Sequence, residues 1–543
     1  MIKPQHILFV AAIIFSSASF AQDTLRKRTV NVTSSFKPVL KEAAKINFTA
    51  APPNADTSRP NLQYNIPNQN LLFAYQPGLL KPLALAIDSG GRWDNWSYFK
   101  AGYGTLNSPY FQTGISLGDG KTAGLNIYAE HFSAKGKIQD QKSSNTGVDL
   151  NGFIQTGNTE IDARFGARDD QYRKYGYQPN TVKFTDDSLD VKYRTFSSRF
   201  AAHNINETAL GISYSPEVKV DAFQDGLNNK ESNVYFNLSV RKYVGKVFSA
   251  EVSVDGNFTN YNPAVGATIK NNFFEVSPSL LFSTPNVSLK AGIRPAWDNG
   301  ASKIFPNILA EFTLDKKLVL QAGWTASLRS NTFQSLANFN PWIWAPNYSN
   351  NSSITERFGG IKGTLTDHFT YSAKLGYNTI TNQPLFVNDT ASGKSFLVLN
   401  EAQMDVLRFN GEFGFNVGEK FSLTSNFIIN RYVNLQRYEK AYGLVPFEFR
   451  TALRIQVLRD LYVKGDLYAF DKPWVRLKNG SNVQGDGAMD LSAGLEFAII
   501  KNLKIWGQFN NILNKEYQRW NQYPSYGFNF MGGLILSFNQ NHK

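Results

Sequence analysis

Cysteine is absent from the 543 residues of this chain, and only 18% of them are charged. The lack of cysteine excludes disulfide scaffolds, cysteine-ligated metal sites and cysteine nucleophiles. No stretch after residue 21 holds the roughly 18 consecutive apolar residues that a membrane-spanning helix needs. A mean hydropathy of −0.32 is also too polar for a bundle of membrane helices. If the chain crosses a membrane, it must therefore cross with strands.

Aromatic residues, in contrast, make up 14% of the chain. From about residue 94 onward, apolar and polar side chains alternate in segments of roughly ten to fourteen residues, which is the period of a strand with two different faces. In residues 447–457, for example, Phe449 and Leu453 fall on one face, whereas Glu448 and Arg450 fall on the other. This pattern indicates strands that have an apolar environment on one side and a polar environment on the other.

About 22 such segments follow one another, and the links between them alternate in length. The links after even-numbered segments are tight, whereas several links after odd-numbered segments are long, namely about 169–190, 329–352, 380–399, 470–485 and 511–526. An even number of strands with short turns at one end and long loops at the other is typical of bacterial outer-membrane barrels. A soluble propeller also has many short strands, but it would not separate apolar from charged faces so consistently. We therefore predict an all-β fold, a transmembrane antiparallel β-barrel of about 22 strands spanning residues 91–543.

The N-terminus predicts export from the cytoplasm. Lys3 precedes an apolar run from Ile7 to Phe20, and Ser19 and Ala21 are the small residues that a signal peptidase reads, so residues 1–21 are interpreted as a cleaved signal peptide. Residues 22–90 contain several prolines and too few apolar residues to form a core. We expect this leader to be extended or loosely folded, in the periplasm or partly inside the barrel.

If one strand face meets lipid, the other lines the barrel lumen, where charges of both signs need water or a polar plug around them. The residues predicted to line the lumen are Lys100, Glu130, Arg164, Arg241, Arg294, Arg408, Arg450, Arg454, Lys464 and Asp490. A barrel of about 22 strands is wide enough to leak unless something fills it. The leader is the segment available to do so.

Two parts of the sequence resemble known receptors of the outer membrane. The C-terminal stretch has an Asn-Ile-Leu-Asn-Lys turn at 511–515, then Tyr523, Pro524 and Gly527, and a last strand that ends in the aromatic residue Phe538. In an internal loop, the residues that carry a resemblance are Arg329, Leu336, Asn340 and Pro341, with Glu356 at the start of the next expected strand. In both places the chain resembles the barrel of a TonB-dependent receptor.

This resemblance implies solute binding or transport across the outer membrane, with membrane lipid as one partner. Thr29, Val30, Asn31, Val32 and Thr33 look like a TonB box, a short segment that adds as an edge strand to a TonB-type energising protein. A flexible tether is the alternative interpretation of these five residues. The segment before the barrel is also too short for the family's globular plug, so the chain resembles a plugless relative, and energised uptake stays open.

Trp342, Trp344 and Tyr348 lie in the internal loop that carries the resemblance. Their rings are candidates for stacking on sugars or planar ligands, and the alternative is that the loops pack on one another and close the pore. A second hypothesis is a non-transporting envelope scaffold, in which the barrel is an anchor and the leader docks a periplasmic or surface partner protein.

Other motifs do not indicate catalysis. Gly114–Gly118 matches the pattern of a nucleophile elbow, but it lies in an expected strand, and Gly118–Thr122 is a hairpin turn rather than a phosphate loop. The histidines at 131, 203, 368 and 542 show no metal-ligand spacing. The cations behind the net charge of +13 are dispersed, which argues against nucleic-acid binding. We expect no catalytic residue, no cofactor and no metal.

Overall fold

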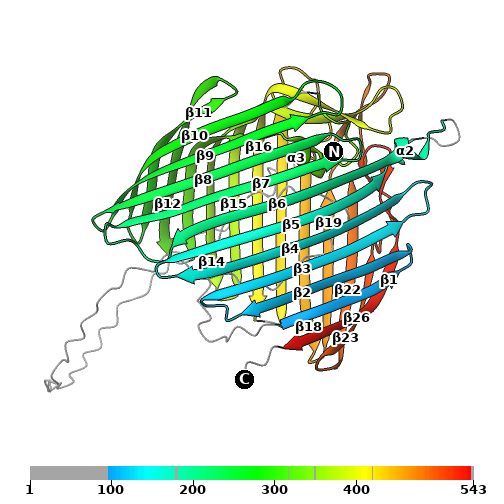
Figure 1. Ribbon diagram of the computed structural model, residues 1–543, viewed down its shortest axis with the longest axis horizontal. Coiled ribbons are helices and arrows are strands. Elements are labelled where there is room, and N and C mark those ends of the chain that lie inside the picture. Colours follow the sequence, from blue (N-terminus) through cyan, green and yellow to red (C-terminus); the bar gives the residue numbers. More distant parts are fainter. Residues whose placement is uncertain (1–95, 178–181, 316, 348–349, 419, 540–543) are drawn as a thin grey trace, which may run out of the picture. The chain divides into compact units, whose positions relative to one another are not determined.

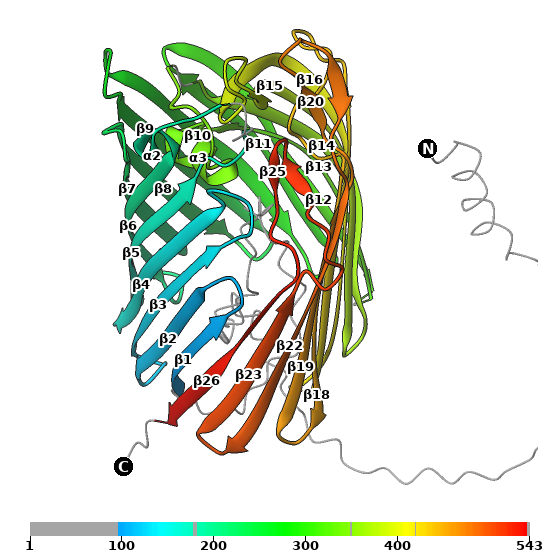
Figure 2. The same ribbon diagram turned by 90° about the vertical axis from the view of Figure 1, so that its right-hand side faces the viewer.

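The computed structural model describes residues 96–539 except 178–181, 316, 348–349 and 419. Within these residues the chain forms a 22-stranded antiparallel sheet that closes into a barrel (Figures 1 and 2). The predicted fold class and strand number are confirmed. The predicted signal peptide, leader and TonB box lie outside the described residues.

Twenty-two strands form the barrel wall, and each is antiparallel to its neighbours. The first eleven are β1 (Trp96–Gly104), β2 (Ser108–Gly118), β3 (Ala123–Lys135), β4 (Lys142–Thr156), β5 (Thr159–Arg173), β6 (Asp190–Asn204), β7 (Ile212–Asp225), β8 (Lys230–Val244), β9 (Phe248–Asn262), β10 (Ile269–Ser283) and β11 (Val287–Asp298). The other eleven are β12 (Ala301–Asp315), β13 (Leu318–Arg329), β14 (Ser352–Thr366), β15 (Phe369–Asn388), β16 (Phe396–Val417), β17 (Phe421–Val433), β18 (Phe447–Leu458), β19 (Leu461–Phe470), β22 (Ala488–Ile500), β23 (Leu503–Asn510) and β26 (Asn529–Asn539).

The long loops contain the remaining elements. These are the helices α2 (Asp186–Leu189) and α3 (Phe333–Phe339), the hairpin of β20 (Trp474–Arg476) with β21 (Asn482–Gln484), and the hairpin of β24 (Gln518–Trp520) with β25 (Tyr523–Pro524). Neither described helix is long and apolar enough to cross a bilayer.

The first and last strands pair with each other and close the sheet. Lys100 of β1 lies opposite Ile535 of β26, and the pairing runs from Trp96 to Gly104. Closure leaves no sheet edge, so every strand of the wall finds backbone partners on both sides, as a wall inside a bilayer must.

The outer face of the wall is apolar and exposed. Phe99, Leu125, Phe165, Leu280 and Leu495 are among its exposed side chains. Their neighbours in the chain point inward, which explains the alternation in the sequence. A closed barrel with an apolar exterior and a polar interior belongs in the bacterial outer membrane, where short turns face the periplasm and long loops face outward.

The turn between β2 and β3 shows how a tight link forms. The Asp119 carboxylate accepts hydrogen bonds from the backbone N–H groups of Ala123, Lys121 and Thr122, which hold the pKa of this carboxyl well below its usual range. Gly118 and Gly120 take positive φ angles there. The prediction of a hairpin turn is therefore confirmed, and Gly114–Gly118 lies within strand β2.

One predicted loop is wrong. Residues 380–399 are mostly strand, because β15 runs to Asn388 and β16 begins at Phe396. Leu385, Phe386 and Val387 are all buried, so both faces of this part of β15 are covered. Because this part of the strand is covered on both faces, its side chains do not alternate in polarity. The alternation used to predict strands therefore does not extend to it. The predicted loops 470–485 and 511–526 likewise contain the two short hairpins.

Candidate functional site

The lumen is the first part of the candidate site. The structure places all ten predicted lumen residues on the strand faces opposite the apolar exterior: Lys100 on β1, Glu130 on β3, Arg164 on β5, Arg241 on β8, Arg294 on β11, Arg408 on β16, Arg450 and Arg454 on β18, Lys464 on β19 and Asp490 on β22. The lumen is therefore charged along much of its circumference.

Pairs across neighbouring strands neutralise many of these charges. Arg241 Nε donates to Glu251 Oε2 at 2.9 Å, and Lys290 Nζ donates to the other oxygen of the same carboxylate at 2.6 Å. Lys464 Nζ donates to Glu496 Oε1 at 2.6 Å. These ion pairs compensate charges that can otherwise be solvated only from the lumen side of the wall.

Other cations lie over aromatic rings. The Arg450 guanidinium lies 4.7 Å from the ring centroid of Tyr468, and that of Arg454 lies 4.4 Å from Tyr462. Lys100 Nζ lies 4.2 Å from the ring of Trp506. These cations are held on ring faces of the inner wall, where they can contact an anionic or aromatic group.

The register of β5 and β6 brings together three side chains whose sequence positions give no metal-ligand spacing. His203 Nε2 lies 4.0 Å from Glu160 Oε1, and its Nδ1 lies 3.8 Å from Asp162 Oδ2. Three potential ligand atoms lie within 4.8 Å of one another. Because each carboxylate faces a different ring nitrogen, the geometry is that of a histidine between two ion-pair partners, whereas a metal would take one ring nitrogen.

The second part of the site is the mouth of the lumen at the long-loop end. Helix α3 lies inside the barrel there (Figure 2). Thr332 caps the helix by accepting from Ser335 N. The Glu231 carboxylate of β8 accepts from Phe333 N at 2.6 Å and from Gln334 N at 3.1 Å. A buried carboxylate at the first turn thus fixes the helix to the inner wall.

A cluster of buried side chains, here called the loop cap, joins α3 and the rest of the β13–β14 loop to the β24–β25 hairpin and to the inner wall. Its members are Tyr172, Val191, Tyr193, Phe223, Tyr261, Phe333, Leu336, Ala337, Ile343, Phe386, Phe396, Trp520 and Tyr523. Phe333 packs edge-on to Phe223 at 5.2 Å, and Trp520 packs on Phe386 and Phe396 at 5.3 and 5.4 Å. Apolar packing therefore holds α3 and the β24–β25 hairpin against the inner wall at the mouth.

The outer-loop residues have different places in this arrangement. Trp342 stacks on Tyr523, with centroids 4.0 Å apart, and its Nε1 donates to Arg173 O at 3.0 Å. Trp344 is 43% exposed and lines a cavity of about 210 Å³. Tyr348 lies outside the described residues. Contact between these residues and a ligand stays a prediction.

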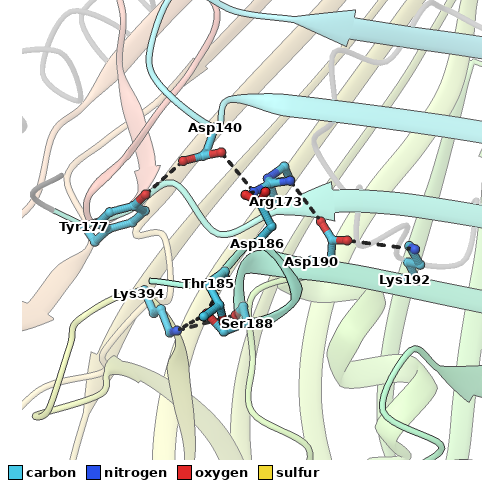
Figure 3. Close-up of polar contacts among 9 residues, drawn as sticks. All are labelled: Asp140, Arg173, Tyr177, Thr185, Asp186, Ser188, Asp190, Lys192 and Lys394. Carbon is cyan, nitrogen blue, oxygen red and sulfur yellow. Dashed lines mark hydrogen bonds and ion pairs between the residues drawn. The ribbon is translucent and has the colours of Figure 1, made fainter. Parts of the chain in front are cut away.

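Arg173, at the end of β5, ties three segments together (Figure 3). Its guanidinium lies 3.1 Å from Asp140 in the β3–β4 loop, 2.7 Å from Asp186 in α2 and 3.3 Å from Asp190 at the start of β6. Tyr177 donates to the second oxygen of Asp140 at 2.9 Å. One side chain thereby sets the spacing of two long loops.

Buried charges also hold the β15–β16 loop. Burial alone would raise the pKa of Asp389, but hydrogen bonds from Ser392 and Ser395 outweigh it and hold that pKa below its usual value. Burial lowers the pKa of Lys394, and burial together with the charge of Lys394 lowers the pKa of Lys174. The Lys394 ammonium lies 3.7 Å from the ring of Phe184, in the β5–β6 loop.

Arg519 is a residue that the sequence analysis missed. It extends from β24, donates to Gly443 O at 3.1 Å and lies 4.4 Å from the ring of Trp520. The β24–β25 hairpin has no alternating pattern long enough to predict. The proximity of Arg519 to Trp520 in sequence was the only available signal, and it does not show that Trp520 packs in the loop cap.

Comparisons with known proteins bear on the fold. A scan against family models gives no match, and no curated protein sequence matches the chain. Among solved structures, the siderophore receptor PirA from Acinetobacter baumannii is similar with a TM-score of 0.62 at 10% identity, over 82% of this chain and 80% of that one.

Two further structures give the same result. The FrpB iron transporter from Neisseria meningitidis has a TM-score of 0.63 at 10% identity, over 82% of this chain and 81% of that one. The ferric-catecholate import receptor Fiu from Escherichia coli K12 has a TM-score of 0.60 at 11% identity, over 82% of each chain. The described part of the chain therefore has the barrel fold of the TonB-dependent receptors of bacterial outer membranes.

Proposed function

We propose that this protein is an outer-membrane receptor that binds a solute at its long-loop end and passes it through the barrel lumen. The observation that carries the proposal is the combination of a wide, charged lumen with loops of the chain that pack into its mouth. Outer-membrane transporters with 22 strands have a lumen that is wide but plugged. The loop cap is held by side-chain contacts and by backbone hydrogen bonds that join Phe396 to Trp342 and Trp344, so opening the mouth would break both.

The lumen residues support a polar solute. Arg450 and Arg454 offer guanidinium groups over Tyr468 and Tyr462, a combination that binds carboxylates, phosphates or electron-rich rings. The three similar structures are described as receptors or transporters for siderophores, iron or ferric catecholates. These structures are 10–11% identical to this chain.

Planar-bilayer recordings test the route. We expect low conductance from the full-length protein, and a higher conductance when residues 22–90 are deleted or when Trp342 is replaced by alanine. If neither change raises the conductance, and other proteins copurify in fixed stoichiometry, the barrel is a scaffold and the proposed transport function is wrong. The loops that pack into the mouth would obstruct a solute, and this obstruction favours the second candidate function.

Energised uptake is a separate part of the proposal. The resemblance of Thr29–Thr33 to a TonB box supports docking of a TonB-type protein by strand addition. Proline at position 30 removes a backbone donor and should weaken that docking. Val30→Pro should therefore reduce both solute uptake and binding to the energising protein, with Val30→Thr as the control. Unchanged uptake and binding would remove the TonB box from the proposal.

A further inference from the structure

The outer wall carries an apolar groove across the middle of strands β4–β7. Its volume is about 360 Å³. Its lining residues are Val148, Leu150, Phe165, Gly166, Ala167, Phe196, Ser197, Ser198, Val220 and Ala222. The large residues among them point outward and are exposed, so the groove faces the lipid rather than the lumen.

The strand register explains the shape of the groove. Ala167 lies beside Phe196, which in turn lies beside Ala222 on the next strand, so a large ring has a small neighbour on each side. One step toward the periplasm, Phe165 pairs with Ser198, and its ring packs edge-on to Phe200 at 5.4 Å. The small side chains leave a channel between the rings, and the Phe165–Phe200 pair bounds it on the periplasmic side.

Cations lie directly above the groove. Arg194 is two residues from Phe196 toward the long loops and points to the same outer face. Its Nε donates to Asp169 Oδ1 at 3.1 Å, and its side chain is 67% exposed. Among the described residues, Asp169 is the only hydrogen-bond partner of this guanidinium, so its terminal amino groups are available outward. Lys192, two residues further, is 48% exposed and lies 3.9 Å from Asp190 (Figure 3).

We infer that this surface binds a phosphorylated glycolipid of the lipid A type, with one acyl chain in the groove and a phosphate on Arg194. The groove lies in the apolar band, where an alkyl chain is the available occupant, and Arg194 and Lys192 lie at its polar border. The guanidinium suits phosphate because it presents two parallel donors. The long-loop end faces the outer leaflet, which lipid A occupies, and this position favours lipid A over a phospholipid.

Binding of defined lipids to the full-length protein in detergent tests the inference, with native mass spectrometry as the measurement. The probe is bisphosphorylated lipid A, compared with dephosphorylated lipid A, phosphatidylglycerol and inorganic phosphate. Arg194→Ala should weaken the binding of lipid A about fivefold, as expected for one cation at a membrane surface. Arg357→Ala is the matched control, since Arg357 also points outward but lies over Trp324 on β13.

Filling the groove should weaken binding without changing a charge. Ala167→Phe and Ala222→Phe place rings where the acyl chain lies, and Ser198→Leu is a smaller alternative if either variant folds poorly. Ala291→Phe is the control, because Ala291 is an exposed outward residue of β11 remote from the groove. Folding of each variant is checked by heat-modifiable migration on gels.

The expected set of results is a loss of lipid A binding in the groove and Arg194 variants together with wild-type binding in both controls. Equal binding of dephosphorylated lipid A would overturn the role of Arg194. Equal binding of phosphatidylglycerol would overturn lipid A as the occupant, and competition by inorganic phosphate alone would overturn the role of the groove.

Discussion

The carboxylate of Glu231 accepts a hydrogen bond from the backbone N–H of Phe333 across 102 residues of sequence, at 2.6 Å. This contact, from the inner face of β8 to the first turn of α3, holds the helix inside the barrel. Glu231 is therefore a buried acidic group through which the inner wall holds the loop cap.

Replacing Glu231 by glutamine should loosen α3. The amide keeps one acceptor and turns a donor toward the helix, which should cost about 1–2 kcal/mol in local stability. Hydrogen exchange of residues 333–339 should become about tenfold faster. Glu217→Gln is the control, because Glu217 pairs with Arg199 at 2.7 Å on the neighbouring strand. If exchange in α3 stays unchanged, the carboxylate does not hold the helix.

The two tryptophans of the outer loop should behave differently. Trp342→Ala removes the stack on Tyr523 and should destabilise the loop cap by about 3 kcal/mol. Trp344→Ala removes an exposed ring and should change stability by less than about 0.5 kcal/mol. Limited proteolysis measures both effects. A loss of solute binding in Trp344→Ala without a loss of stability would identify Trp344 as a ligand contact.

Replacing Arg173 should reduce stability more than replacing another arginine of β5 that has weaker contacts. Arg173→Gln breaks three ion pairs around a side chain that is 15% exposed, which should cost about 1.5–3 kcal/mol in the two loops. Arg164→Gln is the control, since Arg164 is half exposed and lies 3.7 Å from Asp149. Equal protease sensitivity of the two variants would contradict the conclusion that Arg173 links these loops.

The β15–β16 loop should lose stability in acid. The pKa of Asp389 is lower in the folded loop than in an unfolded chain, where it is about 3.9. The folded loop therefore binds fewer protons, and the contribution of Asp389 is complete above the unfolded pKa and lost as the pH falls through the lower, folded one. Exchange of the Ser392 and Ser395 amides, corrected for intrinsic rates, should show this loss. Asp389→Asn should abolish the dependence.

The strands of the wall could be predicted because one face of each strand meets lipid and the other face meets the polar lumen. Residues such as Phe449 and Glu448 alternate between lipid and lumen, so each strand carries its own signal. The loop cap has no such signal, because its contacts join distant segments: Tyr175 donates to Pro524 O across 349 residues. The rings of Trp342 and Trp344 look alike in sequence, and only packing distinguishes the stacked ring from the exposed one.

The pairing of β1 with β26 also constrains how the protein is made. Residues 96–104 find their partners at 531–539, so two segments far apart in the chain must meet before the sheet can close. Neighbouring hairpins can form earlier, but the cylinder stays open until β26 pairs with β1. A chain that stops after β23 would expose two unpaired borders to its surroundings, and we expect the cell to degrade it rather than insert it.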